Sequence, residues 1–220
     1  MTVEFVTVVV DEELSLKVRV FRPDETETRD AVIVLVHQHT LFGGNQGLVM
    51  GLANQLAAKG FVTVTFDMRG AGRSTGRASI TGTAEVQDVV TVCRWAASHL
   101  PAPRIVVSGS SVGATISGAA IDQVEQVIGY VGLGYPFGWL GWLFFGQHKE
   151  PLLNSKKPKL FVMGERDGFT SVRQFRNALK LATGRIVTHL LPKVGHFQME
   201  RPSFDATLAE KIGAFATSLE

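Results

Sequence analysis

Residues 104–121 read RIVVSGSSVGATISGAAI, and they carry the clearest fold signal in the chain. A short β-branched run, Arg104–Val107, leads directly into glycines and serines, and small apolar residues follow with helical character over Val112–Ile121. This order predicts a strand that turns sharply into a helix at Gly109–Gly113 (GSSVG). The glycines remove Cβ atoms that would collide in so tight a turn, and the central Ser111 is expected to have strained backbone dihedrals.

Outward from this stretch, the chain alternates short apolar strands with helices. Such alternation predicts the α/β class, with a mostly parallel twisted sheet that has helices on both faces and begins with an antiparallel hairpin. The predicted strands are Val3–Val10, Leu14–Phe21, Ala31–Val36, Phe61–Phe66, Arg104–Val107, Gln126–Val131, Lys159–Met163 and Arg185–Leu191. The predicted helices are Leu48–Lys59, Ala84–Leu100, Val112–Ile121, Val172–Ala182 and Phe204–Leu219.

Length and composition indicate one globular domain over residues 1–220. Hydrophobic residues make up 45% and charged residues 19% of 220 residues, and the net charge is only +2. The absence of a basic stripe argues against a nucleic-acid partner. Cys93 is the single cysteine, so an intrachain disulfide is excluded and a reducing compartment is compatible. The acidic N-terminal stretch and the absence of a long apolar run predict a cytoplasmic protein without a signal peptide or a membrane span, and membrane contact is not the expected role.

Chemistry is expected just after the strands, because ligands of open parallel sheets bind beyond the carboxyl ends of the strands. Ser111 is the expected nucleophile, and Ser110 is rejected because no glycine lies two residues before it. A serine needs a base, and the base needs an anion that holds its tautomer. His196 is the expected base because it follows the last strand, and Asp167 is the expected acid because it follows the strand Lys159–Met163.

Other side chains compete for these two roles. His189 lies within a predicted strand, and His148 lies in a hydrophobic insertion, so both are weaker candidates for the base. Glu165 is a possible second acid on the same turn as Asp167. Asp167 itself could instead serve only as an Asx turn or as a helix cap.

The loop after the strand Ala31–Val36 reads HQHTLFGG over residues 37–44. In this position a backbone N–H is expected to complete an oxyanion hole with the N–H of Val112. His39 is the first choice for that donor and Gln38 the second. The two histidines have no carboxylate or cysteine beside them, so no metal site is expected, and the His37 side chain is expected to hold the loop by a hydrogen bond.

A glycine-rich loop over residues 67–74 reads DMRGAGRS. It lacks the full pattern of a phosphate-binding loop. We therefore expect the glycines and an Asp67–Arg69 pair to build a structural turn beside the site.

Five segments occur in order: LVHQHTLFGG, FDMRGAGRSTG, SGSSVG, GERDGF and VGHF. Together they resemble the landmarks of the α/β-hydrolase superfamily, most of all its small, nearly capless members of the dienelactone-hydrolase-like and predicted esterase-like type. Those proteins often carry His-Pro-His-Pro where this chain has His37–Thr40 (HQHT). Dienelactone hydrolases use a cysteine nucleophile, whereas this chain has Ser111 at that point and Cys93 within a helix, so their activity is not transferred.

The segment 133–157 is an aromatic-rich insertion between two strands. We expect it to form a short lid whose side chains Tyr135, Phe137, Trp139 and Trp142 bind substrate. The alternatives are that these aromatics pack onto the edge of the sheet, or that they form a surface patch for dimerisation or membrane contact.

The expected function is that of a cofactor-free serine hydrolase, a carboxylesterase or thioesterase acting on a small-molecule acyl substrate. Two alternatives remain open: a receptor-like protein that binds a ligand without useful turnover, and an acyltransferase. The sequence does not indicate an oligomeric state.

Overall fold

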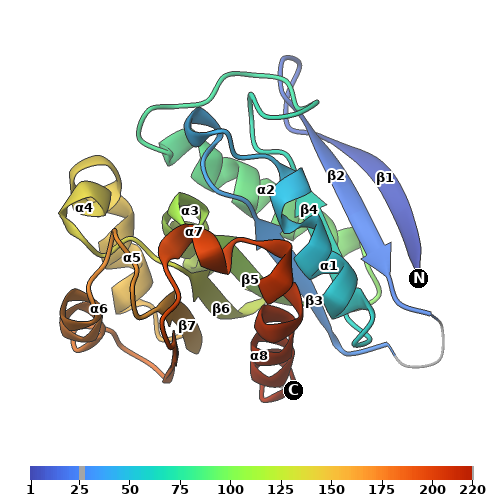
Figure 1. Ribbon diagram of the computed structural model, residues 1–220. Coiled ribbons are helices and arrows are strands. Elements are labelled where there is room, and N and C mark those ends of the chain that lie inside the picture. Colours follow the sequence, from blue (N-terminus) through green and yellow to red (C-terminus); the bar gives the residue numbers. More distant parts are fainter. Residues whose placement is uncertain (25–27, 220) are drawn as a thin grey trace.

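The computed structural model describes residues 1–24 and 28–219, with all side chains of these ranges except those of Leu140 and Trp142. Within these residues, eight strands form one sheet in the order β1-β2-β4-β3-β5-β6-β7-β8 (Figure 1). The hairpin β1–β2 and the pair β2–β4 are antiparallel, and every pair from β4 to β8 is parallel. The predicted α/β-hydrolase fold is therefore confirmed. The strands are β1 Thr2–Val9, β2 Ser15–Arg22, β3 Ala31–Val36, β4 Val62–Phe66, β5 Arg104–Ser110, β6 Val127–Leu133, β7 Lys159–Gly164 and β8 Ile186–Leu191.

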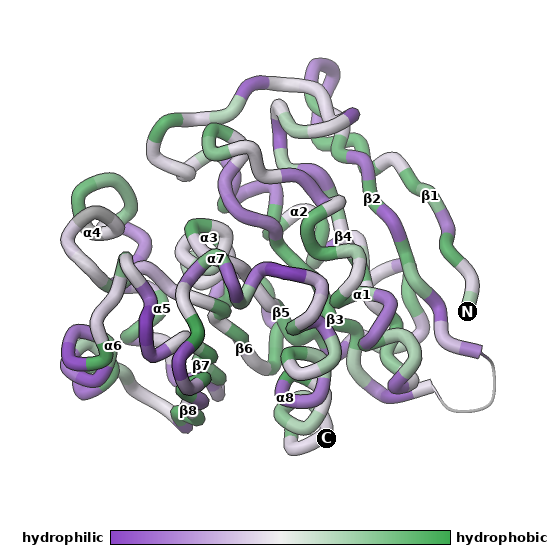
Figure 2. The backbone as a smooth tube through the Cα atoms, in the orientation of Figure 1, coloured by the Kyte–Doolittle hydropathy of each residue, from purple (hydrophilic) through white to green (hydrophobic). Residues whose placement is uncertain are grey.

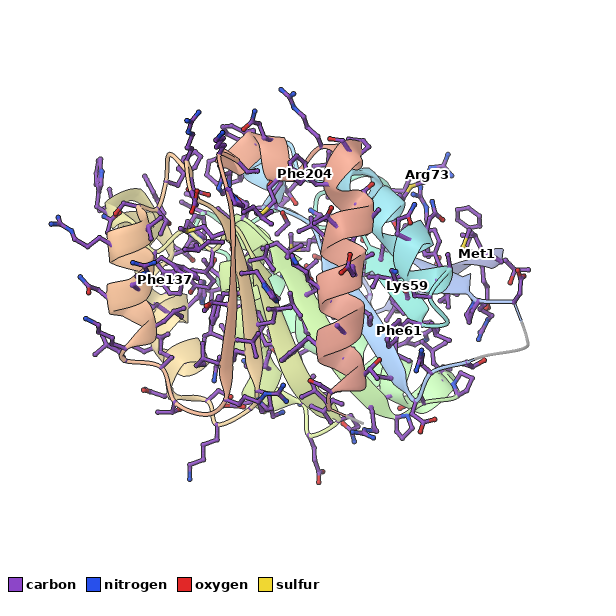
Figure 3. All side chains as sticks on the ribbon, turned by 60° about the horizontal axis from the view of Figure 1, so that its bottom comes forward. Met1, Lys59, Phe61, Arg73, Phe137 and Phe204 are labelled. Atoms are coloured by element: carbon purple, nitrogen blue, oxygen red, sulfur yellow. The ribbon has the colours of Figure 1, made fainter. Side chains whose placement is uncertain are left out.

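Helices cover both faces of the sheet. One face carries α1 and α8, which lie side by side in Figure 1, and the other carries α2, α3, α5 and α6. Phe61, labelled in Figure 3, packs beside α8, where a Cβ added to Gly213 would lie 3.3 Å from its ring. The helices are α1 Met50–Ala57, α2 Thr83–His99, α3 Val112–Ala120, α4 Trp139–Phe145, α5 Lys149–Asn154, α6 Val172–Leu179, α7 His196–Met199 and α8 Asp205–Thr217.

The central strands are apolar because both of their faces are covered. Every residue of β3, β4 and β7 is buried, as a parallel strand between two helical layers requires. The outer strand β1 is mostly exposed. Because these strands run parallel, the carboxyl ends of β3, β5, β7 and β8 meet at one edge of the packed sheet.

The structure moves several predicted boundaries. β5 runs to Ser110 instead of Val107, because Gly109 and Ser110 still pair with Gly132 and Leu133 of β6. The first predicted helix starts as a short 3₁₀ helix, Gln46–Val49, before α1.

The insertion 133–157 contains two helices, α4 and α5, that periodicity did not indicate. Helix α4 lies at the end of the molecule opposite β1 (Figure 1). The hydropathy colours differ between neighbouring elements there: α6 is largely hydrophilic, and the segment that carries α4 includes a hydrophobic turn (Figure 2). Among the helices of residues 1–24 and 28–219, none combines the length and the hydropathy needed to cross a bilayer.

Candidate active site

Ser111 occupies the sharp turn between β5 and α3. Its backbone has φ 52° and ψ −124°, a conformation that costs a non-glycine residue about 1–3 kcal/mol and persists only where the surroundings impose it. Here they do: the Ser111 N–H donates to the Leu133 carbonyl at 2.8 Å, and a Cβ on Gly109 or Gly113 would overlap Ser117 Oγ or the His37 carbonyl oxygen at 2.3 and 2.0 Å. The predicted strand–turn–helix geometry is thus present, with glycines where the chain is most crowded.

A chain of two hydrogen bonds starts at this serine. Ser111 Oγ lies 2.9 Å from His196 Nε2, and His196 Nδ1 lies 2.6 Å from Asp167 Oδ2. Because the carboxylate accepts from Nδ1–H, the neutral imidazole presents an unprotonated Nε2 to the serine hydroxyl. His196 and Asp167 are both buried, so little water competes for these bonds. The arrangement can activate Ser111 as a nucleophile.

Asp167 combines two roles that the sequence left as alternatives. Its Oδ2 faces His196, and its Oδ1 accepts hydrogen bonds from the backbone N–H groups of Phe169 and Thr170 at 2.8 and 2.9 Å. The Asx turn therefore aims the carboxylate at the imidazole. Glu165, the competing acid, is exposed.

The competing histidines have other surroundings. His148 Nε2 lies 2.7 Å from the Thr81 carbonyl oxygen, and burial lowers the pKa of this ring. His189 lies within β8.

His37 fixes the loop that follows β3, as the sequence predicted. The Met68 N–H donates to Nε2 at 3.1 Å, so the proton of the neutral ring lies on Nδ1, which is 2.5 Å from the Gln38 carbonyl oxygen. Burial lowers the pKa of His37 to about 4, against smaller opposing effects that include the neighbouring Asp67. The ring is therefore neutral near pH 7, and its two bonds tie the loop after β3 to Met68, which lies in the loop after β4.

The side chains of the two candidate oxyanion residues of this loop have different surroundings. Gln38 lines the cavity in front of Ser111, and the His39 ring is completely buried. Val112 is the first residue of α3, and N–H groups of a first helical turn have no partner within the helix. The N–H of Val112, next to Ser111, therefore has no partner within α3, and Val112 and Gln38 both line the same cavity.

A cavity of about 400 Å³ opens in front of Ser111. Its wall is mainly aromatic, and among the lining residues that the structure describes His196 is the one with an ionisable side chain. The lining residues are Gln38, Phe42, Ser111, Val112, Pro136, Gly141, Phe144, Phe145, Phe169, His196 and Phe197.

The predicted substrate-binding aromatics need correction. Tyr135 and Phe137 are buried core residues whose rings stack at 4.1 Å, and Phe137 packs against Phe161 and Phe175 toward the α6 end of the molecule (Figure 3). Trp139 is 67% exposed and does not line the cavity. The side chain of Trp142 lies outside the described part of the structure.

Sequence reasoning did not assign the aromatic residues that line the cavity. Phe144 and Phe145 come from the last turn of α4, and Phe42 comes from the loop after β3. A signal existed for two others, because Phe197 directly follows His196 and Phe169 lies two residues after Asp167. Because Phe169 and Phe197 are so close in sequence to the predicted acid and base, their side chains could have been expected beside the same cavity.

The loop over residues 67–74 is structural, but its ion pair differs from the expected one. Arg69 binds Asp88 of α2, with an Nη2–Oδ1 distance of 2.6 Å, and not Asp67. Asp67 instead accepts hydrogen bonds from the backbone and the side chain of Gln46, both at 2.9 Å. Elsewhere in the described residues, no three His, Cys, Asp or Glu side chains converge as a metal site would need.

Relatives of the chain place this geometry in a wider group. The family model of the X-Pro dipeptidyl-peptidase (S15 family) matches residues 12–129. An Escherichia coli protein described as an uncharacterized 31.7 kDa protein in the traX–finO intergenic region is 33% identical over 113 residues, which are 49% of this chain. The match spans only 39% of that relative's length.

Solved structures resemble the whole chain. An α/β serine hydrolase homologue from Coxiella burnetii is 27% identical, with a TM-score of 0.78 and 96% of each chain covered. At 19% identity, a serine hydrolase without a lid from Xanthomonas campestris has a TM-score of 0.79 over 96% of this chain and 93% of that one, which shows a shared fold. Because the family model covers more than half of the 220 residues, the chain belongs to the X-Pro dipeptidyl-peptidase (S15) family of the α/β-hydrolase superfamily.

Proposed function

We propose that the protein is a serine hydrolase that cleaves a carboxylic ester or thioester through an acyl-enzyme on Ser111. The observation that carries this proposal is the hydrogen-bonded chain Ser111–His196–Asp167 at the floor of an apolar cavity. Membership of a hydrolase family supports it, and so does the likeness to a Coxiella burnetii protein described as a serine hydrolase homologue.

The reaction proceeds in two halves. His196 takes the hydroxyl proton of Ser111 as Oγ attacks the substrate carbonyl carbon, and Asp167 stabilises the imidazolium that forms. The N–H of Val112 and an N–H of the Gln38–His39 segment bind the oxyanion. The imidazolium then protonates the departing alcohol or thiol, leaving the acyl group on Ser111. Water, deprotonated by His196, releases the acid and restores the serine, so no step needs a cofactor.

The cavity wall favours an uncharged, hydrophobic substrate group. Phe144, Phe145, Phe42 and their neighbours offer apolar surface, and burying apolar area contributes about 25 cal/mol per Å². A charged group would lose its hydration there without an opposite charge. We therefore assign a small-molecule acyl substrate with an aliphatic or aromatic part, and we assign segment 133–157 as a short lid within a single catalytic domain.

A peptidase is the second candidate, and the name of the family model favours it. The neighbouring side chains offer some support. Ser110 Oγ donates to Glu200 Oε1 at 3.2 Å, and Glu200 and Asp205 line a second cavity, of only about 30 Å³, that shares Gln38 with the larger one. These carboxylates could attract the free amino group of a peptide. The larger cavity contains Ser111 itself, and none of its lining residues in the described part of the chain is a carboxylate.

Labelling with a fluorophosphonate probe tests the proposal. We expect covalent modification of Ser111 in the folded wild type and none in Ser111→Ala. Ser110→Ala is the matched control, because it removes the neighbouring hydroxyl and should still be labelled. Wild type that stays unlabelled would exclude the hydrolase and leave a receptor-like binding protein.

A substrate panel then separates the candidate reactions. We expect hydrolysis of p-nitrophenyl esters, faster for hexanoyl than for acetyl groups, and little release of nitroaniline from an X-Pro dipeptide nitroanilide. The reverse preference would favour the peptidase. Product esters formed when an alcohol is added would indicate an acyltransferase.

A further inference from the structure

A second imidazole–carboxylate pair lies in the interior behind the loop that follows β3. His39 and Glu85 have no exposed surface, and His39 Nε2 lies 3.7 Å from Glu85 Oε1. Glu85 belongs to the first turn of α2, 46 residues along the chain from His39. The reaction described above uses neither side chain.

Hydrogen bonding determines the tautomer of this histidine. The Leu41 N–H donates to His39 Nδ1 at 3.1 Å, so Nδ1 carries no proton and the neutral ring is protonated on Nε2. Among the described residues, Nε2 has no hydrogen-bond partner at normal distance. The Nε2–H is therefore oriented by weaker electrostatic attraction, from the Glu85 carboxylate at 3.7 Å and from the nearby Ser79 backbone.

Glu85 is itself held in place. Ser79 donates its N–H to Oε1 at 2.7 Å and its hydroxyl to Oε2 at 2.5 Å. These bonds leave the carboxylate facing the loop and not the solvent.

Other charged or titratable groups surround the pair. Arg69 and Asp88 bind each other one turn further along α2. His37 and His148 lie close enough to interact electrostatically with His39 and with Glu85, respectively. Burial lowers the pKa of His39, and the Glu85 charge opposes this shift, so the ring is neutral near pH 7.

The His39 ring connects this interior pair to the site. It caps the short 3₁₀ helix Thr40–Phe42 through the bond from Leu41. It also contacts two aromatic residues of the cavity wall, with ring centroids 6.1 Å from Phe42 and 5.8 Å from Phe145. A rotation of the ring would therefore disturb both the Gln38–His39 peptide and the aromatic wall.

We infer that Glu85 is a positioning residue for the oxyanion hole, acting through the orientation of the His39 ring. The inference rests on the proposed function, because it concerns the loop that would supply one oxyanion donor. Its consequence is specific. Loss of the Glu85 charge should weaken binding of the transition state more than binding of the substrate, since the loop peptide meets the carbonyl oxygen fully only when that oxygen is charged.

The test uses Glu85→Gln and its matched control Asp88→Asn. Both residues are fully buried carboxylates of α2, but Asp88 binds Arg69 and does not touch the loop. We expect Glu85→Gln to lower kcat about tenfold with KM nearly unchanged, and to weaken an alkyl boronic acid inhibitor by the same factor. Asp88→Asn should lower the melting temperature while kcat stays within about twofold of wild type.

A second background separates positioning from general damage. In His39→Asn, the amide oxygen can still accept the Leu41 N–H, but no ring remains for Glu85 to orient. Adding Glu85→Gln to this variant should therefore change kcat less than about twofold. Equal tenfold losses in both backgrounds, or an unchanged kcat in folded Glu85→Gln, would overturn the inference.

A physical readout distinguishes failure of this inference from failure of the proposed function. ¹⁵N NMR of the imidazole rings reports the protonation and the surroundings of each nitrogen of His39. We expect the Nε2–H form in both proteins, because the Leu41 N–H occupies Nδ1, and a shifted Nε2 resonance in Glu85→Gln, because the charge that faces this nitrogen has been removed. That result stands or falls whether or not Ser111 reacts with a fluorophosphonate, and an unchanged Nε2 resonance in Glu85→Gln would contradict the assigned role of Glu85.

Discussion

The described residues contain two buried histidine–carboxylate pairs, and the pairs differ in what the imidazole meets at the nitrogen that does not face the carboxylate. His196 binds Asp167 at 2.6 Å through Nδ1 and faces the Ser111 hydroxyl through Nε2. His39 is 3.7 Å from Glu85 at Nε2 and faces only the Leu41 N–H at Nδ1. The His196 ring can exchange a proton with the Ser111 hydroxyl at the cavity, whereas the His39 ring is fully buried. The two pairs thus have the same kinds of residue. Contact with a nucleophile decides which of them can take part in a reaction.

The largest effect on kcat should come from removing the Ser111 hydroxyl, which the His196–Asp167 pair contacts and the His39–Glu85 pair does not. Ser111→Ala should lower kcat for p-nitrophenyl butyrate by about 10⁴- to 10⁶-fold, because the acyl-enzyme can no longer form. Ser110→Ala, one residue away, should retain most of the activity, and a comparable loss in that variant would contradict the assignment. Initial rates with purified, folded variants provide the measurement.

The same amide substitution in both pairs compares them directly. Asp167→Asn should lower kcat about 10³- to 10⁴-fold, because the amide favours the His196 tautomer with a proton on Nε2, which cannot accept from Ser111. Its Oδ1 can still form the Asx turn with Phe169 and Thr170, so the melting temperature should change little. Glu85→Gln should cost far less, about tenfold. Similar losses in the two variants would remove the distinction between a reacting pair and a positioning pair.

Acid should lower the free energy of unfolding through protonation of His37. Its pKa of about 4 in the folded protein lies below the ordinary value of 6.5, so the unfolded chain binds a proton that the folded protein excludes. The stabilisation is complete above about pH 6.5 and is lost as the pH falls toward 4, by about 3 kcal/mol. Urea unfolding of wild type and His37→Asn between pH 7 and pH 4 measures the part of the pH-dependent stability that comes from His37. His39 and His148, whose pKa values are also lowered, are present in both proteins. Parallel stability curves for the two proteins would exclude His37 as the source.

The smallest expected effect is on substrate preference, and it concerns the aromatic cavity wall. Phe144 lines the cavity and is 49% exposed, and Trp139 of the same helix is 67% exposed and outside it. Phe144→Ala should reduce the preference for hexanoyl over acetyl esters about tenfold, a change of about 1–2 kcal/mol in transition-state binding. Trp139→Ala should leave that ratio unchanged. If Trp139→Ala alters the ratio and Phe144→Ala does not, the lid has been assigned the wrong face.

Much of the site follows from local sequence. The tight turn at Ser111 needs only Gly109 and Gly113 as neighbours, and the positions of Asp167 and His196 follow from the strands that precede them. Each strand could be recognised because its burial on both faces leaves a short, continuous apolar run. The family resemblance then supported the order of the three residues along the chain.

The contents of the cavity wall could not be predicted in the same way. Tyr135 and Phe137 are as aromatic as Phe144 and Phe145 and belong to the same segment, yet the first two enter the core and the last two line the cavity. The difference depends on where α4 begins, at Trp139, and on which side of that helix meets the rest of the molecule. A segment rich in glycine and aromatics has no clear periodicity that would reveal this side.

The sequence by itself determined the strands and their order along the chain, the turn at Ser111 and the candidates to act with it, Asp167 and His196, because each of these follows from neighbours in the chain. Only the tertiary structure decided that Gln38 faces the cavity while His39 faces Glu85, and that Arg69 binds Asp88 instead of Asp67. Backbone dihedrals of single loop residues reverse the direction of a side chain, and partners distant in sequence meet only when the layers pack. Those contacts have no local signature, and they are the ones that shape the cavity and hold the loop beside Ser111.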